Sequence, residues 1–372
     1  MSYTAAELAD GARNMLEGCA ELAPGMSLLI IAEPPESGPQ PYYDPGLAPA
    51  VAAVAEGIGA EVEILHRPFD PVVRDPEPAL AARIDAADRV LFLARLGDQL
   101  RFRDRTGATP CVMSYALDRE MLASPFGRIP HASMVALKAL IDGALATTDE
   151  IRVTCPAGTE FRAPGAAFPV GGGDTVTRRF PLSVFSPVPS RVTGHVAQKG
   201  FLCATGSQAY EPPACEIADT LFVAIAGDRL VGFDGTALDV LAAREHYDYV
   251  AQLFGLDRDA THSWHGGIHP GCAYTRPASQ NFDRWSNGAF GNPRLLHFHT
   301  CGADPPGEIS LNILDPTLWV GGTALVDAGR LRPERLAGGP QFLAAHPMLA
   351  HALAHPTREV GAPSGQLSFR DA

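Results

Sequence analysis

The 372-residue sequence lacks both an excess of positive charge and a long apolar run. Its 29 lysine and arginine residues are outnumbered by 42 aspartate and glutamate residues, and the formal net charge is −13. A nucleic-acid-binding surface needs basic side chains for the phosphates, so this balance argues against that class of partner. No apolar run reaches the roughly 18–20 residues that a helix needs to cross a bilayer. We therefore expect neither a nucleic acid nor a membrane among the partners.

Signals for secretion and for cysteine-based sites are also missing. Residues 1–18 combine acidic residues with helical spacing, whereas a signal peptide has a basic start and an apolar core. The seven cysteines are scattered and never form a C-x-x-C pair, which argues against a zinc ribbon and against a disulfide framework. The sequence therefore predicts a reduced, cytoplasmic protein.

The motifs of several large enzyme families are absent. There is no G-x-G-x-x-G after the first expected strand, and no Walker A, H-E-x-x-H or G-x-S-x-G motif. Most of the standard enzyme signatures are thereby excluded. The glycine cluster at 171–175 can in principle cradle an anion, but such a cluster is more typical of a loop.

Strands and helices alternate in the first part of the chain. We expect strands at 26–34, 61–66, 89–95 and 110–115, and helices at 4–22, 46–58, 77–87 and 131–147. This alternation predicts an α/β N-terminal domain with a parallel sheet, over residues 1–148. From residue 149 strands become frequent, turn residues recur roughly every 8–12 positions, and one clear helix remains at 235–255. Residues 149–372 are therefore expected to form a strand-rich α+β metal-binding domain.

Histidine is concentrated in one window of the second domain. Five of the twelve histidines fall within residues 262–299, and His297 and His299 stand one residue apart in an apolar run. On a strand, side chains at i and i+2 point to the same face. Burying two unpartnered imidazoles costs roughly a few kcal/mol, so the pair indicates a metal site or, alternatively, a satisfied polar network. We expect His246, upstream in the predicted helix, to lie on the helix surface.

Two histidines of one strand and a third from a neighbouring strand form a facial set. The same window offers His262, His265 and His269 for the third ligand. Such a set leaves open positions on an iron, manganese or cobalt ion. Aromatic and arginine side chains in the same window suit a planar, anionic ligand. The substrate-binding candidates are Trp264, Arg276, Trp285 and Arg294.

Two segments carry a resemblance to a known family. Residues 151–163, IRVTCPAGTEFRA, resemble the strand–turn–strand that opens the C-terminal domain of the aminopeptidase T and S group of metallo-aminopeptidases. They also resemble the same segment of an oxygenase relative, 2,5-dihydroxypyridine 5,6-dioxygenase. Residues 309–331 are similar to the closing hairpin of both groups. The order of features agrees from about residue 5 to residue 332.

The resemblance implies which positions have changed. The peptidases hold two metal ions with glutamates, histidines, a tyrosine and an aspartate. Here the resemblance places Gln208 at the first glutamate and His297 and His299 at a closing His-x-Asp. At the second glutamate it favours His265 over the alternative, His262. Neutral side chains cannot offset the repulsion of two close divalent ions. The resemblance therefore implies the mononuclear Fe(II) site of the dioxygenase branch, with His299 in place of its aspartate.

A second alignment register keeps the family's aspartate at Asp315 and leaves the histidine pair less well explained. For the leading hypothesis we expect Glu211 and His269 to handle protons, and Gln208 to orient a ligand or the substrate. The predicted function is a mononuclear non-haem Fe(II) dioxygenase that uses O2 to oxidise or cleave a small hydroxylated (hetero)aromatic substrate.

Two other functions stay open at this point. One is a metallohydrolase of the aminopeptidase type that acts on a peptide or amide bond through a zinc-bound water. The other is a binding protein without turnover. Relatives of this architecture also suggest a homo-oligomer.

Overall fold

The computed structural model describes residues 3–35, 41–71, 75–100, 109–166, 177–204, 210–302 and 308–370. The chain forms two compact units that interleave in sequence. The first comprises Met1–Val135 and Asp174–Ser183, and the second comprises Ala136–Gly173 and Val184–Ala372. The expected division between residues 148 and 149 stays a prediction.

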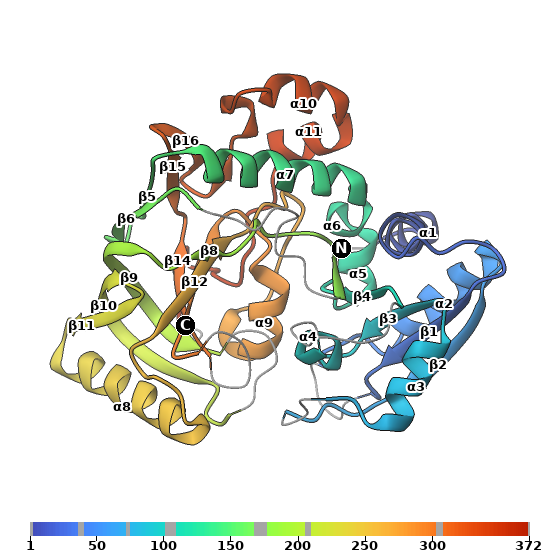
Figure 1. The fold of residues 1–372 in the computed structure, drawn as a ribbon, viewed down its shortest axis with the longest axis horizontal. Helices are drawn as coiled ribbons and strands as arrows, with labels where there is room; N and C mark the ends of the chain where they lie inside the picture. The colour runs from blue at the N-terminus through green and yellow to red at the C-terminus, as the bar shows by residue number, and fades with distance from the viewer. Residues whose placement is uncertain are drawn as a thin grey trace. The chain divides into compact units, whose positions relative to one another are not determined.

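The first unit is built on a five-stranded parallel sheet with the order β2-β1-β3-β4-β7. Figure 1 labels β1 to β4 of this sheet. Its strands are β1 (Ser27–Ala32), β2 (Glu61–His66), β3 (Arg89–Leu93), β4 (Cys111–Ser114) and β7 (Thr177–Phe180). The predicted α/β fold with a parallel sheet is confirmed. Strand β7 was not predicted as a member of this sheet, because it follows two strands of the second unit along the chain.

Helices precede, connect and follow these strands along the chain. They are α1 (Ala5–Arg13), a π-helical turn (Asn14–Cys19), α2 (Leu47–Ile58), α3 (Pro78–Ala86), α4 (Leu96–Leu100), α5 (Arg119–Ala123) and α6 (Pro125–Arg128). Helix α1 begins with a capping box. The hydroxyl oxygen of Thr4 accepts from the backbone N–H of Glu7, and the carboxylate of Glu7 accepts from the backbone N–H of Thr4. Helix α7 (His131–Thr147) carries the chain from the first unit into the second.

The second unit contains a 12-stranded sheet in which every neighbouring pair is antiparallel. The order is β17-β16-β15-β5-β6-β9-β14-β13-β12-β8, and β10 and β11 branch from β9. The strands are β5 (Glu150–Thr154), β6 (Glu160–Pro164), β8 (Val188–Pro189), β9 (Val192–Cys203), β10 (Ala214–Gly227), β11 (Arg229–Asp234), β12 (Thr261–Gly266), β13 (Leu295–Thr300), β14 (Ile309–Leu314), β15 (Thr317–Val320), β16 (Thr323–Asp327) and β17 (Arg330–Leu331). The expected strand-rich character of this part of the chain is confirmed.

The helices of the second unit are α8 (Ala237–Phe254), α9 (Phe282–Ala289), α10 (Gly339–Ala345) and α11 (Pro347–Ala354), with 3₁₀ turns at Ala278–Gln280 and Pro333–Arg335. Helix α8 packs against β10 and matches the predicted helix closely. His246 on α8 is buried, next to the ring of Tyr210, so its expected place on the helix surface is wrong. Among the described helices, none combines the length and the apolar character that crossing a membrane requires.

Candidate metal centre

Three histidines share one face of the antiparallel sheet. In the register of β12 and β13, His265 lies directly opposite His297, and Ser263 lies opposite His299. Directly opposed residues of an antiparallel pair point to the same side of the sheet, as do residues two apart on one strand. The sheet itself therefore brings the three imidazoles together.

The three rings lie close to one another and are buried. The ring centroid of His265 is 4.2 Å from that of His297 and 5.0 Å from that of His299, and the last two are 5.0 Å apart. One ring nitrogen from each residue lies within 4.8 Å of the others. Their exposed fractions are 4%, 3% and 8%.

The separation of the ligand atoms fits a single ion. The Nε2 atoms of His265 and His299 are 2.9 Å apart. Two nitrogens bonded to one ion at about 2.1 Å, at a right angle, are about 3 Å apart. Among the residues that the structure describes, His265, His297 and His299 are the histidine, cysteine or carboxylate side chains that come close enough in a group of three to share one ion. The three side chains are therefore able to hold a transition-metal ion.

A carboxylate that the sequence reasoning missed completes this group. Glu308 immediately precedes β14, is 3% exposed, and its carboxylate contacts Nδ1 of His299. The sequence holds a weak signal for it, because a lone glutamate stands directly before residues 309–314, ISLNIL, in which apolar residues alternate with polar ones. A carboxylate hydrogen-bonded to the outer nitrogen of a histidine orients the ring and raises its basicity as a ligand.

The neighbouring strand adds neutral polar groups on the same face. Asn312 lies opposite His297 and Ser310 lies opposite His299. The backbone N–H of Asn312 donates to Gln198 Oε1 at 2.7 Å, and its side chain accepts from Ser310 Oγ at 2.8 Å. Burial raises the pKa of the adjacent Cys203 thiol to about 12, so this thiol stays protonated at neutral pH.

An aromatic side chain packs directly on the histidines. The ring centroid of Phe290 lies 4.2 Å from that of His297. Trp285, a predicted substrate-binding residue, packs on Phe290 at 5.0 Å, and its Nε1 donates to the backbone oxygen of Val360 at 2.8 Å. Trp285 thus packs on the ring that in turn packs on His297, and that ring, Phe290, was not among the residues predicted from the sequence.

Trp264 lies on the opposite face of the sheet from the histidines. It is adjacent to His265 on β12, and alternation turns it away. Its ring packs at 5.4 Å from that of Phe161, 6.0 Å from that of Phe185 and 6.1 Å from that of Phe298. The structure therefore places this predicted substrate-binding residue in an apolar core rather than beside the histidines.

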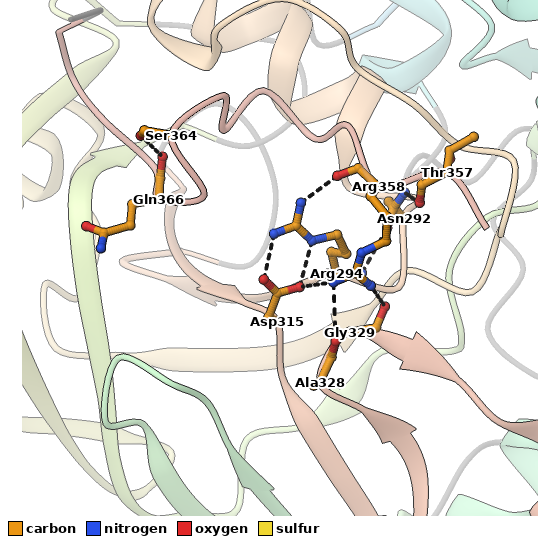
Figure 2. A network of polar contacts seen from close by, with 9 residues as sticks. All are labelled: Asn292, Arg294, Asp315, Ala328, Gly329, Thr357, Arg358, Ser364 and Gln366. Atoms are coloured by element: carbon orange, nitrogen blue, oxygen red, sulfur yellow. Dashed lines mark hydrogen bonds and ion pairs between the residues drawn. The ribbon is translucent and has the colours of Figure 1, made fainter. Parts of the chain in front are cut away.

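Arg294 and Asp315 form a clamp at the ends of β13 and β14 (Figure 2). Arg294 donates through Nε and Nη2 to the two carboxylate oxygens of Asp315, at 2.6 Å each. Arg358 Nη2 donates to Asp315 Oδ1 at 3.0 Å. Asp315, the alternative ligand of the second register, thus accepts hydrogen bonds from two arginines and lies outside the three-histidine group.

Arg276, the remaining predicted substrate-binding residue, is exposed.

The predicted proton-handling residues are dispersed. His269 follows β12 and is fully buried, and this burial lowers its pKa to about 3. Its Nδ1 accepts from the backbone N–H of Gly271 at 3.2 Å, which leaves the ring hydrogen on Nε2. Glu211 is exposed, and Gln208 lies outside the described residues. His262, the alternative ligand, is exposed and lies outside the three-histidine group.

Comparison with known proteins identifies a structural relative. No family model matches the sequence, and no curated protein does so. Among solved structures, the fold is similar to that of 2,5-dihydroxypyridine dioxygenase from Pseudomonas putida KT2440, with a TM-score of 0.58. The match covers 90% of this chain and 99% of that chain, at 14% sequence identity. The chain therefore shares its fold with that enzyme.

Proposed function

We propose that this protein is a mononuclear, Fe(II)-dependent dioxygenase whose metal is held by His265, His297 and His299. The observation that carries the proposal is the convergence of three buried imidazoles within 4.8 Å, on a fold similar to that of a dihydroxypyridine dioxygenase. Imidazole donors suit iron, and a facial set of three leaves positions for other ligands. Ferrous iron, when bound, supplies open coordination positions and the redox chemistry that couples O2 to an organic substrate.

The charge of the donor set favours an anionic substrate. Imidazoles bind metals in their neutral form, so three of them leave the full charge of a divalent ion in a buried site. An anion brought to such a site gains Coulomb energy that water does not screen strongly. A small hydroxylated ring that binds as its anion fits this requirement, and dihydroxypyridines are the first substrates to test.

The side chain of Phe290 shapes the space for that substrate. Phe290 contributes an apolar surface beside His297, which suits the face of a flat ring and excludes water. His269 is neutral at physiological pH, because its pKa is about 3, and its Nε2–H makes it a hydrogen-bond donor. In the proposal Gln208 orients the substrate and Glu211 takes up a proton released on binding. Arg276 remains a candidate for steering an anion from solvent.

The same donor set favours a second candidate function. Three histidines with one open position also form the catalytic zinc sites that activate water. The segment at 151–163 resembles that of metallo-aminopeptidases, so the second candidate is hydrolysis of a peptide or amide bond. This reaction consumes no O2, which separates it from the first.

Oxygen consumption tests the proposed function. Iron-loaded protein is mixed with 2,5-dihydroxypyridine, other hydroxylated pyridines and hydroxylated benzoates in an oxygen-electrode chamber. We expect substrate-dependent O2 uptake with at least one of these rings, and loss of uptake in His297→Ala. Hydrolysis of aminoacyl amides by zinc-loaded protein, without O2 uptake from any ring, would replace the proposal with the hydrolase.

A further inference from the structure

We propose that Glu308 is a positioning residue that supplies negative charge to the three-histidine site through His299. The inference rests on the proposed metal site, and it concerns a side chain that would not itself touch the ion. The carboxylate of Glu308 pairs with Nδ1 of His299, while Nε2 of the same ring lies 2.9 Å from Nε2 of His265. One imidazole thus joins the carboxylate to the place where an ion is held.

The contact with Glu308 determines which nitrogen of His299 is free to bind a metal. A carboxylate accepts hydrogen bonds only, so its place beside Nδ1 of His299 favours the tautomer that carries the ring hydrogen on Nδ1. In the neutral ring the lone pair then resides on Nε2, the atom that points to His265. Glu308 therefore selects the tautomer and the ring orientation that metal binding requires.

The register of the sheet explains why this glutamate reaches His299. Ser310 lies directly opposite His299, and residue 308 lies two positions before Ser310 on the same side of the chain. Such diagonal neighbours are within reach of a long side chain. Tyr210 also holds this part of the backbone, because its hydroxyl donates to the carbonyl of Glu308 at 3.2 Å.

Charge gives the glutamate a role beyond orientation. Glu308 is 3% exposed, and a carboxylate taken out of water needs a compensating positive partner. A divalent ion held by three neutral imidazoles is such a partner, since charges interact strongly where water is excluded. The carboxylate and the ion would therefore stabilise each other through the His299 ring.

Metal affinity of charge-removing variants tests the inference. Glu308→Gln keeps the size of the side chain and an acceptor oxygen but removes the charge. Glu216→Gln is the matched control, because it removes one charge from the same unit, at a site where Glu216 pairs with the exposed Arg370. Affinity for Co(II) is measured by chelator competition, with circular dichroism to verify the fold.

We expect Glu308→Gln to weaken Co(II) binding by roughly 10- to 100-fold, Glu308→Asp to lose less, and Glu216→Gln to match the wild type. Equal affinity of folded Glu308→Gln and wild type would overturn the inference and leave the proposed function intact. Absence of Co(II) and Fe(II) binding in the wild type would overturn the proposed function, and the inference with it.

A second measurement needs only the wild-type protein. In the Co(II)-loaded protein, NMR detects ring N–H protons of the coordinating histidines as strongly shifted signals. We expect the His299 Nδ1–H signal to exchange slowly with solvent, because a buried carboxylate accepts its hydrogen bond. Fast exchange of this proton, or coordination of the ion through Nδ1 of His299, would contradict the role of Glu308 even if Glu308→Gln fails to fold.

Discussion

At the residue scale, the position of each histidine on its strand separates ligands from neighbours. His297 and His265 face each other across one rung of the sheet, whereas His262 is exposed. Strand alternation and cross-strand pairing account for this difference without reference to any particular metal.

His297→Ala tests the ligand assignment most simply. Structural zinc sites distribute roughly 10–16 kcal/mol over four ligands, so loss of one ligand should weaken metal binding by at least about 100-fold. We expect the same loss in O2 uptake. His262→Ala is the control and should keep the affinity of the wild type. Retention of full metal content by His297→Ala, measured by elemental analysis, would show that His297 is no ligand.

His299→Asp tests the effect of charge at the third ligand. The variant should still hold an ion, but a ligand carboxylate removes one unit of positive charge from the site. A unit charge about 4 Å away, at an effective dielectric constant near 20, is worth several kcal/mol. We therefore expect KM for an anionic ring to rise at least about 10-fold, with a smaller change for a neutral ring. Equal changes for both substrates would point to a structural role for His299.

Proximity of Glu308 leads to a further expectation for this variant. An aspartate at position 299 would stand near Glu308, and two buried carboxylates repel each other. Combining His299→Asp with Glu308→Gln should therefore recover metal affinity relative to His299→Asp alone. Chelator competition on the two variants measures this difference.

At the element scale, the clamp of Arg294 and Asp315 joins the start of β13 to the end of β14. Asp315→Asn should destabilise the second unit by about 2–3 kcal/mol, because it leaves two arginines short of their partner. Urea denaturation of metal-free protein measures this cost. The metal affinity of folded Asp315→Asn should stay within about threefold of the wild type. Loss of metal binding without loss of stability would instead make Asp315 a ligand.

Helix α8 carries a buried histidine that makes stability depend on pH. Burial lowers the pKa of His246 to about 4, from an ordinary value of 6.5. Between pH 6.5 and 4 the unfolded state takes up a proton at this position and the folded state does not, so the unfolding free energy falls as the pH falls. We expect His246→Leu to flatten this slope in metal-free protein. An unchanged slope would mean that burial does not lower the pKa of His246.

Most elements could be predicted because their signals are local. Apolar strands and amphipathic helices show characteristic spacings of apolar residues in the sequence. Helix α8 and strands β1 to β4 lie where those spacings predicted them. Strand β7 escaped prediction because its partner β4 is distant in sequence, and no local pattern specifies which sheet a strand joins. The short helices α4, α5 and α6 have too few turns to show a helical period in the sequence.

The site was predictable to the extent that its residues share a strand. The i, i+2 spacing of His297 and His299 survives in any register, and it predicted their common face. The same alternation places Trp264 on the other face of the sheet from His265. The rule that predicted the common face of the histidines therefore argues against Trp264 as a substrate-binding residue. Glu308 could not be selected, because its link to His299 depends on the pairing of β13 with β14.

At the scale of the whole molecule, the chain carries a formal net charge of −13, whereas the three candidate ligands are neutral imidazoles. A negative protein attracts divalent cations and disfavours the approach of anions over long range. The local charge of a bound ion must therefore provide the attraction for an anionic substrate. The central claim is accordingly that one iron ion resides in the three-histidine group.

The direct test of this claim is elemental analysis of protein purified without oxygen and without added metal. The account predicts one iron ion per chain, lost from His297→Ala and retained in His262→Ala. Zinc in place of iron, or two metal ions per chain, would contradict the mononuclear iron site and favour the hydrolase.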